Sequence, residues 1–260
     1  MLQIESCFLY PVKGMTPIEA PSLVLKPGES VEGDRAFVFA FADAERRGAI
    51  EWVSKNESIT LLSWPELAAI ETSYDSDQRT LTLRAADGTQ ASARVDDAAQ
   101  RESLAGWLAA LVKASPRNPL SGRPEREPLV LLGDGSARFT DRGPTQISIG
   151  AVESLAALTA AAKVDVDMRR FRFNLVVAGG QAWDDFGWAG ERLRIGETLV
   201  EVSAPLVRCK AVNASPEGGG RDINLLDVLD SEFGHLNFGV EANVLEGGVV
   251  RPGDPVSVLR

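Results

Sequence analysis

The sequence is poor in histidine and cysteine. Its 260 residues include one histidine, His235, and two cysteines, Cys7 and Cys209. A single imidazole excludes any metal site that needs two or more of them, including the HExxH zinc site. The two cysteines lie too far apart in the sequence for a CxxC metal site or a framework of disulfides. Each thiol therefore has to be considered by itself.

Long apolar runs and a secretion signal are also missing. No stretch approaches 18 consecutive apolar residues, and the opening segment has no basic stretch followed by a long apolar run and a small-residue cleavage site. These absences predict a cytoplasmic protein that has no membrane partner.

Positive charge is scarce as well. Lys and Arg number 27 against 37 Asp and Glu, which gives a formal net charge of −10. A protein of this sign does not attract phosphate backbones or anionic lipid in general, so we expect no nucleic-acid partner. An anionic ligand is expected to bind only in a local basic pocket.

Short β-type runs dominate what is present. Three segments have helical periodicity: 98–113 behind Asp97 as the cap, 150–163, and 223–232 behind Asp222. Neither GxGxxG nor GxxxxGK[ST] occurs, which argues against a doubly wound nucleotide-binding sheet. The sequence predicts a mainly β fold with a few helices (α+β), of barrel or sandwich type. Strands are expected at 2–10, 22–25, 36–41, 58–62, 80–83, 129–132, 146–149, 174–177, 198–202, 240–245 and 256–259.

A proline-rich stretch divides the chain. Residues 114–128 hold four prolines and five charged residues with almost nothing to bury, which is the composition of a surface linker. We therefore expect an N-terminal β-rich domain at 1–118, a linker at 119–128 and a second β domain at 129–260.

Cys209 is the thiol with the features of a reactive group. It follows an expected strand and stands between the cations Arg208 and Lys210. Positive charge stabilises a thiolate, the form in which cysteine acts as a nucleophile or binds a soft metal. A buried small apolar residue is the alternative, and the residues alone leave both open. Cys7 lies in an apolar strand pattern, where we expect core packing.

Cations also gather at three other places. Three arginines stand in the segment 168–174, MRRFRFN, and such a cluster in an acidic protein can clamp an oxyanion or a phosphate. A solvated charged edge is the alternative. Lys13 is followed by Gly14, and Arg35 follows Gly33 by two positions, where glycine lets a backbone approach a ligand closely.

The motifs occur in an order that resembles a known family. They are YPVKG at 10–14, GDRAFVF at 33–39, FTDRGP at 139–144, FRFN at 171–174 and PLVRC at 205–209. This order resembles that of proteins with a MOSC domain preceded by a MOSC N-terminal β-barrel domain, and by motif it is most similar to the amidoxime-reducing component family. The resemblance spans nearly the whole chain.

The resemblance implies binding of a molybdenum cofactor, Mo-molybdopterin. It assigns the thiolate of Cys209 to the metal and to catalysis, which agrees with the preference of soft metals for thiolate. The positions that it assigns to binding the cofactor are Lys13, Gly14, Arg35, Asp141, Arg172, Asn174 and Arg208.

For the activity, the resemblance implies reduction of N-hydroxylated small molecules. Two cysteines cannot ligate an iron–sulfur cluster, so we expect a separate electron-donor protein, ferredoxin-like or cytochrome b5-like with its reductase. One alternative is a carrier, in which Cys209 holds sulfur as a persulfide or holds the cofactor transiently for delivery. Another is a structural β protein that has lost the cofactor.

Some positions depart from the family pattern or stay open. Leu206 stands where relatives often have a second cysteine, which excludes a mechanism with two thiols. Trp183, Phe186 and Trp188 are candidates for a wall near the cofactor or for closing the barrel. His235 belongs either to the site or to a surface loop.

The assignments together predict where the site lies. We expect a cleft between the two β domains, with Lys13 and Arg35 of the first domain facing Arg172 and Cys209 of the second. Arg170 is expected in solvent.

Overall fold

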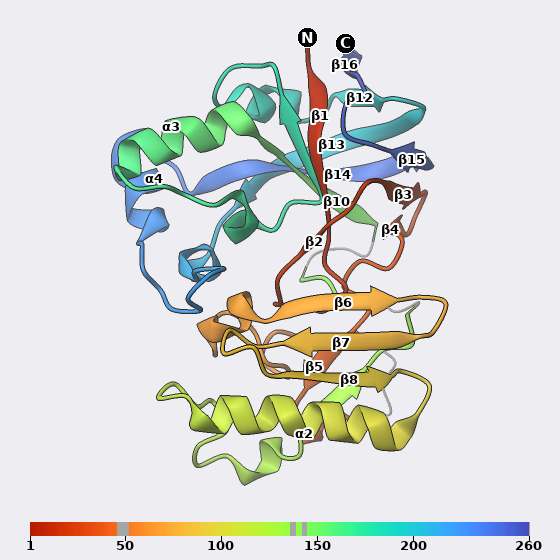
Figure 1. The fold of residues 1–260 in the computed structure, drawn as a ribbon. Helices are drawn as coiled ribbons and strands as arrows, with labels where there is room; N and C mark the ends of the chain where they lie inside the picture. The colour runs from red at the N-terminus through yellow and green to blue at the C-terminus, as the bar shows by residue number, and fades with distance from the viewer. Residues whose placement is uncertain (46–51, 136–138, 142–144, 260) are drawn as a thin grey trace.

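A computed structural model describes residues 1–45, 52–135, 139–141 and 145–259 of the chain (Figure 1). The strands of this part are β1 (Gln3–Leu9), β2 (Ile18–Glu19), β3 (Leu23–Lys26), β4 (Ser30–Val31), β5 (Val38–Ala40), β6 (Glu71–Asp75), β7 (Thr80–Arg84), β8 (Gln90–Arg94), β9 (Val130–Leu132), β10 (Gln146–Ala151), β11 (Leu175–Ala178), β12 (Arg192–Ile195), β13 (Thr198–Val207), β14 (Asn237–Glu246), β15 (Gly248–Val250) and β16 (Val256–Leu259). Its α-helices are α1 (Ala42–Glu45), α2 (Ala98–Ala114), α3 (Val152–Ala162) and α4 (Leu225–Phe233). Its 3-10 helices are η1 (Pro65–Ala69), η2 (Pro124–Arg126), η3 (Met168–Phe171), η4 (Asp184–Trp188) and η5 (Lys210–Asn213).

The largest sheet closes into a barrel. Its eight strands follow the order β16-β12-β13-β14-β10-β11-β1-β2, and only the β10–β11 pair, which α3 connects, is parallel. Backbone bonds join β1 to the other end of the sheet: the Ile4 amide donates to Asp254 at 2.9 Å, and the Val256 amide donates to Leu2 at 2.9 Å. The expected mainly β, α+β fold of barrel type is thereby confirmed.

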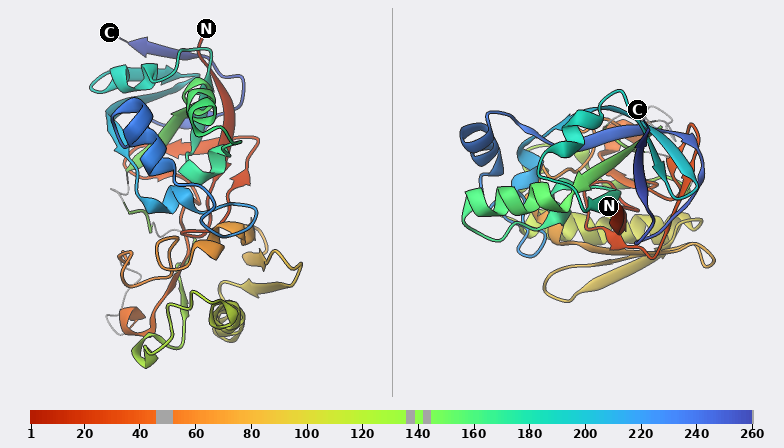
Figure 2. Two further views of the ribbon diagram at one scale, coloured as in Figure 1. Left: turned by 90° about the vertical axis from the view of Figure 1, so that its left-hand side faces the viewer. Right: turned by 90° about the horizontal axis from the view of Figure 1, so that it is seen from above.

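The chain forms two lobes, which lie one above the other in Figure 1 and in the left view of Figure 2. The barrel lobe consists of β1–β4, β10–β16, α3 and α4. The helix lobe consists of β5–β9, α1 and α2, with the hairpin sheet β6-β7-β8 beside α2. Each lobe has its own apolar core, one around Ile149, Val200 and Val240 in the barrel and one around Phe37, Leu81 and Leu108 in the helix lobe.

Neither lobe is one continuous stretch of the chain. Strands β1–β4 precede the expected boundary but lie in the barrel lobe, where β1 pairs with β11 and β3 pairs with β15. Strand β9 follows the boundary but pairs with β5 of the helix lobe. The segment 119–128 consists of turns and η2 and connects α2 to β9 within the helix lobe. Hydrogen bonding between distant strands therefore sets the spatial division, and proline content does not.

Most expected elements are present, and the differences have physical reasons. Asp97 caps α2 as expected, because its side chain accepts a hydrogen bond from the Gln100 amide at 3.1 Å. Asp222 does not start α4, which follows Asn224, because its carboxylate pairs with Arg170. The expected strand at 58–62 is irregular and ends in a turn; Ile59 and Leu61 are buried in the helix-lobe core, Leu62 is exposed, and Ser58 makes a single bridge.

The sequence analysis missed several strands, of which β6 and β8 are the longest. Most residues of both strands are exposed, so too few apolar side chains are present to show the alternation that predicts a strand. Pairing with β7 forms them. None of the helices in the described ranges has the length and apolar character that crossing a membrane requires.

Candidate functional site

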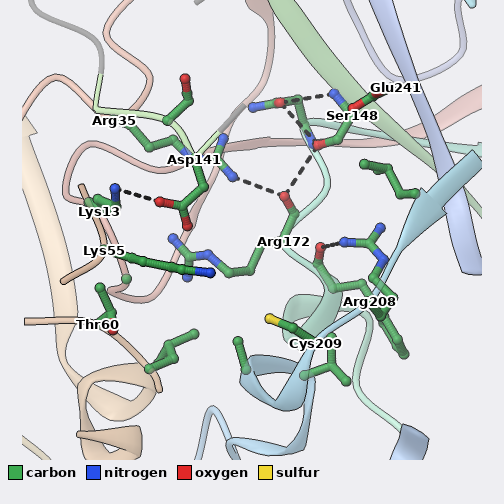
Figure 3. A pocket seen from close by; sticks show the side chains of 18 of the residues that line it. Lys13, Arg35, Lys55, Thr60, Asp141, Ser148, Arg172, Arg208, Cys209 and Glu241 are labelled. Atoms are coloured by element: carbon green, nitrogen blue, oxygen red, sulfur yellow. Dashed lines mark hydrogen bonds and ion pairs between the residues drawn. The ribbon is translucent and has the colours of Figure 1, made fainter. Parts of the chain in front are cut away.

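A cavity of about 410 Å³ lies where the two lobes meet (Figure 3). Its lining comes from the loop after β1, the loop before β5, the segment 60–62 of the helix lobe, η3 and the loop after β13. Every residue that the sequence analysis assigned to the site lines it: Lys13, Gly14, Arg35, Asp141, Arg172, Asn174, Arg208 and Cys209. The structure thus brings the predicted set together, and the individual roles in binding a cofactor stay predictions.

Backbone pairing places Lys13 beside Arg35. The segment after β1 runs parallel to the segment before β5: the Arg35 amide donates to Tyr10, the Phe37 amide donates to Pro11, and the Lys13 amide donates to Phe37, at 2.6, 3.0 and 2.9 Å. Backbone hydrogen bonds therefore hold the two motifs, YPVKG and GDRAFVF, side by side.

Lys13 is a buried cation that already has a carboxylate partner. Its Nζ lies 2.6 Å from Oδ1 of Asp141 and 3.3 Å from the carbonyl of Val53. Asp141 is 60% exposed and lies at the mouth of the cavity. The remainder of the FTDRGP motif, residues 142–144, lies outside the described residues.

Two arginines pack on one buried aromatic ring. The guanidinium carbons of Arg35 and Arg172 lie 4.2 and 4.4 Å from the ring centroid of Tyr10. Arg35 pairs with Asp34 and donates from Nη2 to the Arg172 carbonyl at 3.0 Å. Cation–π contact with a buried ring fixes both guanidinium groups beside the cavity.

Arg172 has a donor without a partner. Its Nη1 donates to the Met15 carbonyl at 2.6 Å, whereas the buried Nη2 has no hydrogen-bond partner among the described residues. Burial, together with the like charge of Arg35, lowers the pKa of Arg172 to about 10, so the group stays protonated at neutral pH. An anion bound in the cavity can accept this unused hydrogen bond and compensate the buried charge.

Asn174 and Arg208 use their polar atoms within the protein. Asn174 accepts from both the amide and the hydroxyl of Ser148 at 3.2 Å and donates to the Phe8 carbonyl at 3.4 Å. Arg208 donates to the carbonyls of Phe238 and Phe171 at 2.5 to 3.0 Å. Both side chains hold the walls of the cavity in place.

The expectation that Arg170 lies in solvent is wrong. Arg170 is 6% exposed, lines the cavity, pairs with Asp222 at 2.7 Å and donates to the Asn213 carbonyl at 3.3 Å. The short helix η3 directs the Arg170 side chain toward the segment after Cys209, which carries the carboxylate of Asp222. Arg169 points elsewhere, pairs with Asp167 and is not part of the lining.

Cys209 is exposed and borders the cavity, with its sulfur pointing into the open space (Figure 3). Of the two neighbouring cations, Arg208 lines the cavity and donates to backbone carbonyls, and Lys210 is not part of the lining; their effect on the thiol stays a prediction. The wall beside the sulfur is apolar and consists of Leu61, Leu62, Leu206, Val207, Ala211 and Val212.

The described residues contain no cluster of three or more His, Cys, Asp and Glu side chains that could hold a metal ion. A metal bound through Cys209 must therefore bring most of its ligands with it. A metal within an organic cofactor meets this requirement.

Several lining residues escaped the sequence analysis, notably Lys55, Thr60, Ser148 and Glu241. None of them stands in a motif or beside a glycine turn. Lys55 lies in a loop of the helix lobe, and only the packing of the lobes brings it near Cys209.

The aromatic residues considered for a cofactor wall lie elsewhere. Trp183 and Phe186 pack against His235, with ring centroids 5.1 and 5.2 Å apart, and Trp188 packs in the barrel core. None of them lines the cavity, and neither does His235.

Comparison with known proteins identifies the domains. The MOSC domain family matches residues 137–257, and the family described as the MOSC N-terminal beta barrel domain matches residues 1–115. The chain is therefore a MOSC-domain protein that carries the N-terminal domain as well.

Individual relatives are distant. The chain is 23% identical to the molybdenum cofactor sulfurase of Drosophila grimshawi, across 99% of this chain and 35% of that protein, so it spans about a third of that relative's length. Among solved structures, the YUAD protein of Bacillus subtilis is 12% identical with a TM-score of 0.47, covering 99% of this chain and 96% of the other. YiiM of Geobacillus stearothermophilus is 21% identical with a TM-score of 0.33, covering 44% and 54%.

Proposed function

We propose that the chain binds a molybdenum cofactor of the Mo-molybdopterin type in the cavity between its lobes and reduces N-hydroxylated compounds there. The observation that carries the proposal is the presence of an exposed thiol, Cys209, and a buried guanidinium with an unused donor, Arg172, in one cavity. A soft metal and a phosphate are the two groups that such a pair suits. When bound, this cofactor supplies two-electron redox chemistry.

The chain's own residues have distinct tasks in this proposal. The thiolate of Cys209 ligates the metal, and Arg172, held by Tyr10 and Met15, binds the phosphate. Arg35 adds a second positive charge, of which Asp34 neutralises a part. The apolar wall beside Cys209 excludes water from the side where substrate enters.

Electrons have to come from outside these 260 residues. The chain has two cysteines and no dinucleotide-binding motif, so it provides neither an iron–sulfur cluster nor a nicotinamide site. We propose a ferredoxin-like or cytochrome b5-like donor with its reductase, which reaches the cofactor through the mouth near Asp141.

The test combines composition with turnover. Molybdenum and pterin are measured in freshly purified protein, and benzamidoxime reduction is then followed with reduced viologen and, separately, with NADH. We expect stoichiometric molybdenum, turnover with viologen and none with NADH. Protein without molybdenum or pterin, when isolated from cells that make the cofactor, would overturn the proposal.

A carrier of sulfur or of the cofactor is the second candidate. It is favoured by the exposure of Cys209 and by the match, along almost the whole chain, to a relative named as a molybdenum cofactor sulfurase. A carrier would hold a persulfide on Cys209 or release its cofactor to another protein. Loaded protein that stays inactive with every low-potential donor and a panel of hydroxylamines and amidoximes would favour this candidate.

A further inference from the structure

Lys55 is a cation in the cavity that the family motifs do not include. It lies in a loop of the helix lobe, is exposed, and lines the cavity together with Cys209 and Arg172. Figure 3 shows its ammonium group and the sulfur of Cys209 pointing toward one another across the open space. A ligand that occupies this space lies between the thiol and the ammonium group.

Four other cations of the lining already have partners, and a fifth, Arg172, is the one assigned above to the phosphate of the cofactor. Lys13 pairs with Asp141, Arg35 with Asp34 and Arg170 with Asp222. Arg208 donates to backbone carbonyls. Lys55 makes no ion pair with a carboxylate of the described residues, so its charge is available to a ligand.

The surroundings of Lys55 set the kind of ligand that it can bind. Across the cavity from Lys55, the wall around Cys209 is apolar and suits a hydrocarbon or aromatic body. An ammonium group that faces an apolar wall attracts a carboxylate and repels a second cation. The cavity thus offers one apolar contact and one anion contact close to the thiol.

We propose that Lys55 determines substrate specificity, by selecting N-hydroxylated compounds that carry an anionic group, such as a carboxylate, on an apolar body. This inference rests on the proposed function, since it names the substrate class of the same site. Cationic compounds of the same size bind least well, because their charge faces Lys55 without compensation.

The experiment measures binding in the absence of an electron donor. Three ligands share one body and differ in charge: 4-carboxybenzamidoxime, benzamidoxime and 4-(aminomethyl)benzamidoxime. Calorimetry gives their Kd values for molybdenum-loaded wild type, Lys55→Gln and Lys55→Glu. Lys210→Gln is the matched control, since Lys210 is an exposed lysine next to Cys209 that does not line the cavity.

Wild type is expected to bind the carboxylate ligand about tenfold more tightly than the neutral one, which is the strength of one charge-assisted contact. Lys55→Gln abolishes this difference, Lys55→Glu reverses it in favour of the aminomethyl ligand, and Lys210→Gln leaves it unchanged. The molybdenum and pterin content of all variants stays at the wild-type level.

Three results would overturn the inference: equal preference in wild type and Lys55→Gln, no binding of any of the three ligands, or loss of pterin in Lys55→Gln. The last would make Lys55 a contact of the cofactor instead. A failure of the proposed function gives a different result. The ligands would then bind with the charge preference that Lys55 causes, but no electron donor would support their reduction.

Discussion

The same side chain, cysteine, occurs in two regions of this protein with opposite consequences. Cys7 lies on β1 inside the barrel, fully buried, where its thiol contacts the Val250 carbonyl and burial raises its pKa to about 11. Cys209 lies in the loop after β13, exposed at the junction of the lobes. The comparison shows that location decides whether a thiol packs in the core or is accessible to a ligand.

Buried charges differ between these regions in the same way. Arg172 borders the cavity, where a ligand can supply the missing partner. Asp185 of η4 is fully buried beside Ser154, has one oxygen without a partner among the described residues, and lies away from the cavity lining. Burial raises the pKa of Asp185 to about 6. The first group is suited to binding, and the second reduces stability.

The largest effect is expected from exchanging the two thiols for hydroxyls. Cys209→Ser should lower molybdenum content to below about a tenth of wild type, because a hydroxyl is a poor ligand for a soft metal. Cys7→Ser should keep the metal and lower the free energy of unfolding by about 1 to 2 kcal/mol, because it places a more polar group in the core. Elemental analysis and urea denaturation measure the two effects. Equal molybdenum content in both variants would contradict the assignment of Cys209.

A smaller effect is expected at the arginines. Arg172→Gln should reduce the pterin retained after gel filtration by about tenfold, the value of one lost charge-assisted hydrogen bond. Arg169→Gln is the matched control, because Arg169 pairs with Asp167 outside the cavity. If both variants retain pterin equally, the arginines form a charged edge and no clamp.

Removing the buried acid tests the packed region. A carboxyl group whose pKa is raised on folding favours the folded state when protonated and disfavours it when ionised. The stability that protonated Asp185 contributes is therefore complete below about pH 4 and is lost as the pH rises through about 6. Asp185→Asn should therefore raise the free energy of unfolding at pH 7 by about 2 to 3 kcal/mol and leave it unchanged at pH 4. Urea denaturation at both pH values measures the difference.

Asp184→Asn provides the control for this experiment. Asp184 is the exposed neighbour on the same helix, where it accepts from the Gln181 amide at 3.0 Å. Its variant should show the pH dependence of wild type. The explanation for Asp185 fails if Asp185→Asn is equally destabilised or stabilised at both pH values.

The smallest effect is expected from Tyr10→Phe. Its ring carries both cation–π contacts, whereas its hydroxyl is buried and has no partner among the described residues. Tyr10→Phe should therefore change the free energy of unfolding by less than about 1 kcal/mol and retain pterin. Tyr10→Leu should lose pterin, because no ring remains to hold the arginines. Pterin loss in Tyr10→Phe would assign the function to the hydroxyl instead.

Much of the fold class and of the candidate site could be predicted from the sequence. The fold class, the cap of α2 and the set of lining residues from Lys13 to Cys209 follow from composition, local pattern and motifs, which act over a few residues. The strands β6 and β8 could not be predicted, because most of their residues are exposed and too few apolar residues alternate along them. The place of Lys55 in the cavity could not be predicted either. No sequence pattern distinguishes this loop lysine, and it lies near Cys209 only because the two lobes pack together.

The sequence by itself determined which reactive and structural groups are present: two thiols, one histidine, glycines beside cations and many short β-type runs. What only the tertiary structure decided is which of these groups meet. The ladder between the Tyr10 and Arg35 segments, the pairing of β1 with β11 and the burial of Arg170 against Asp222 join residues far apart in the chain. Their contacts depend on burial and hydrogen bonding across the whole fold, which no local pattern encodes.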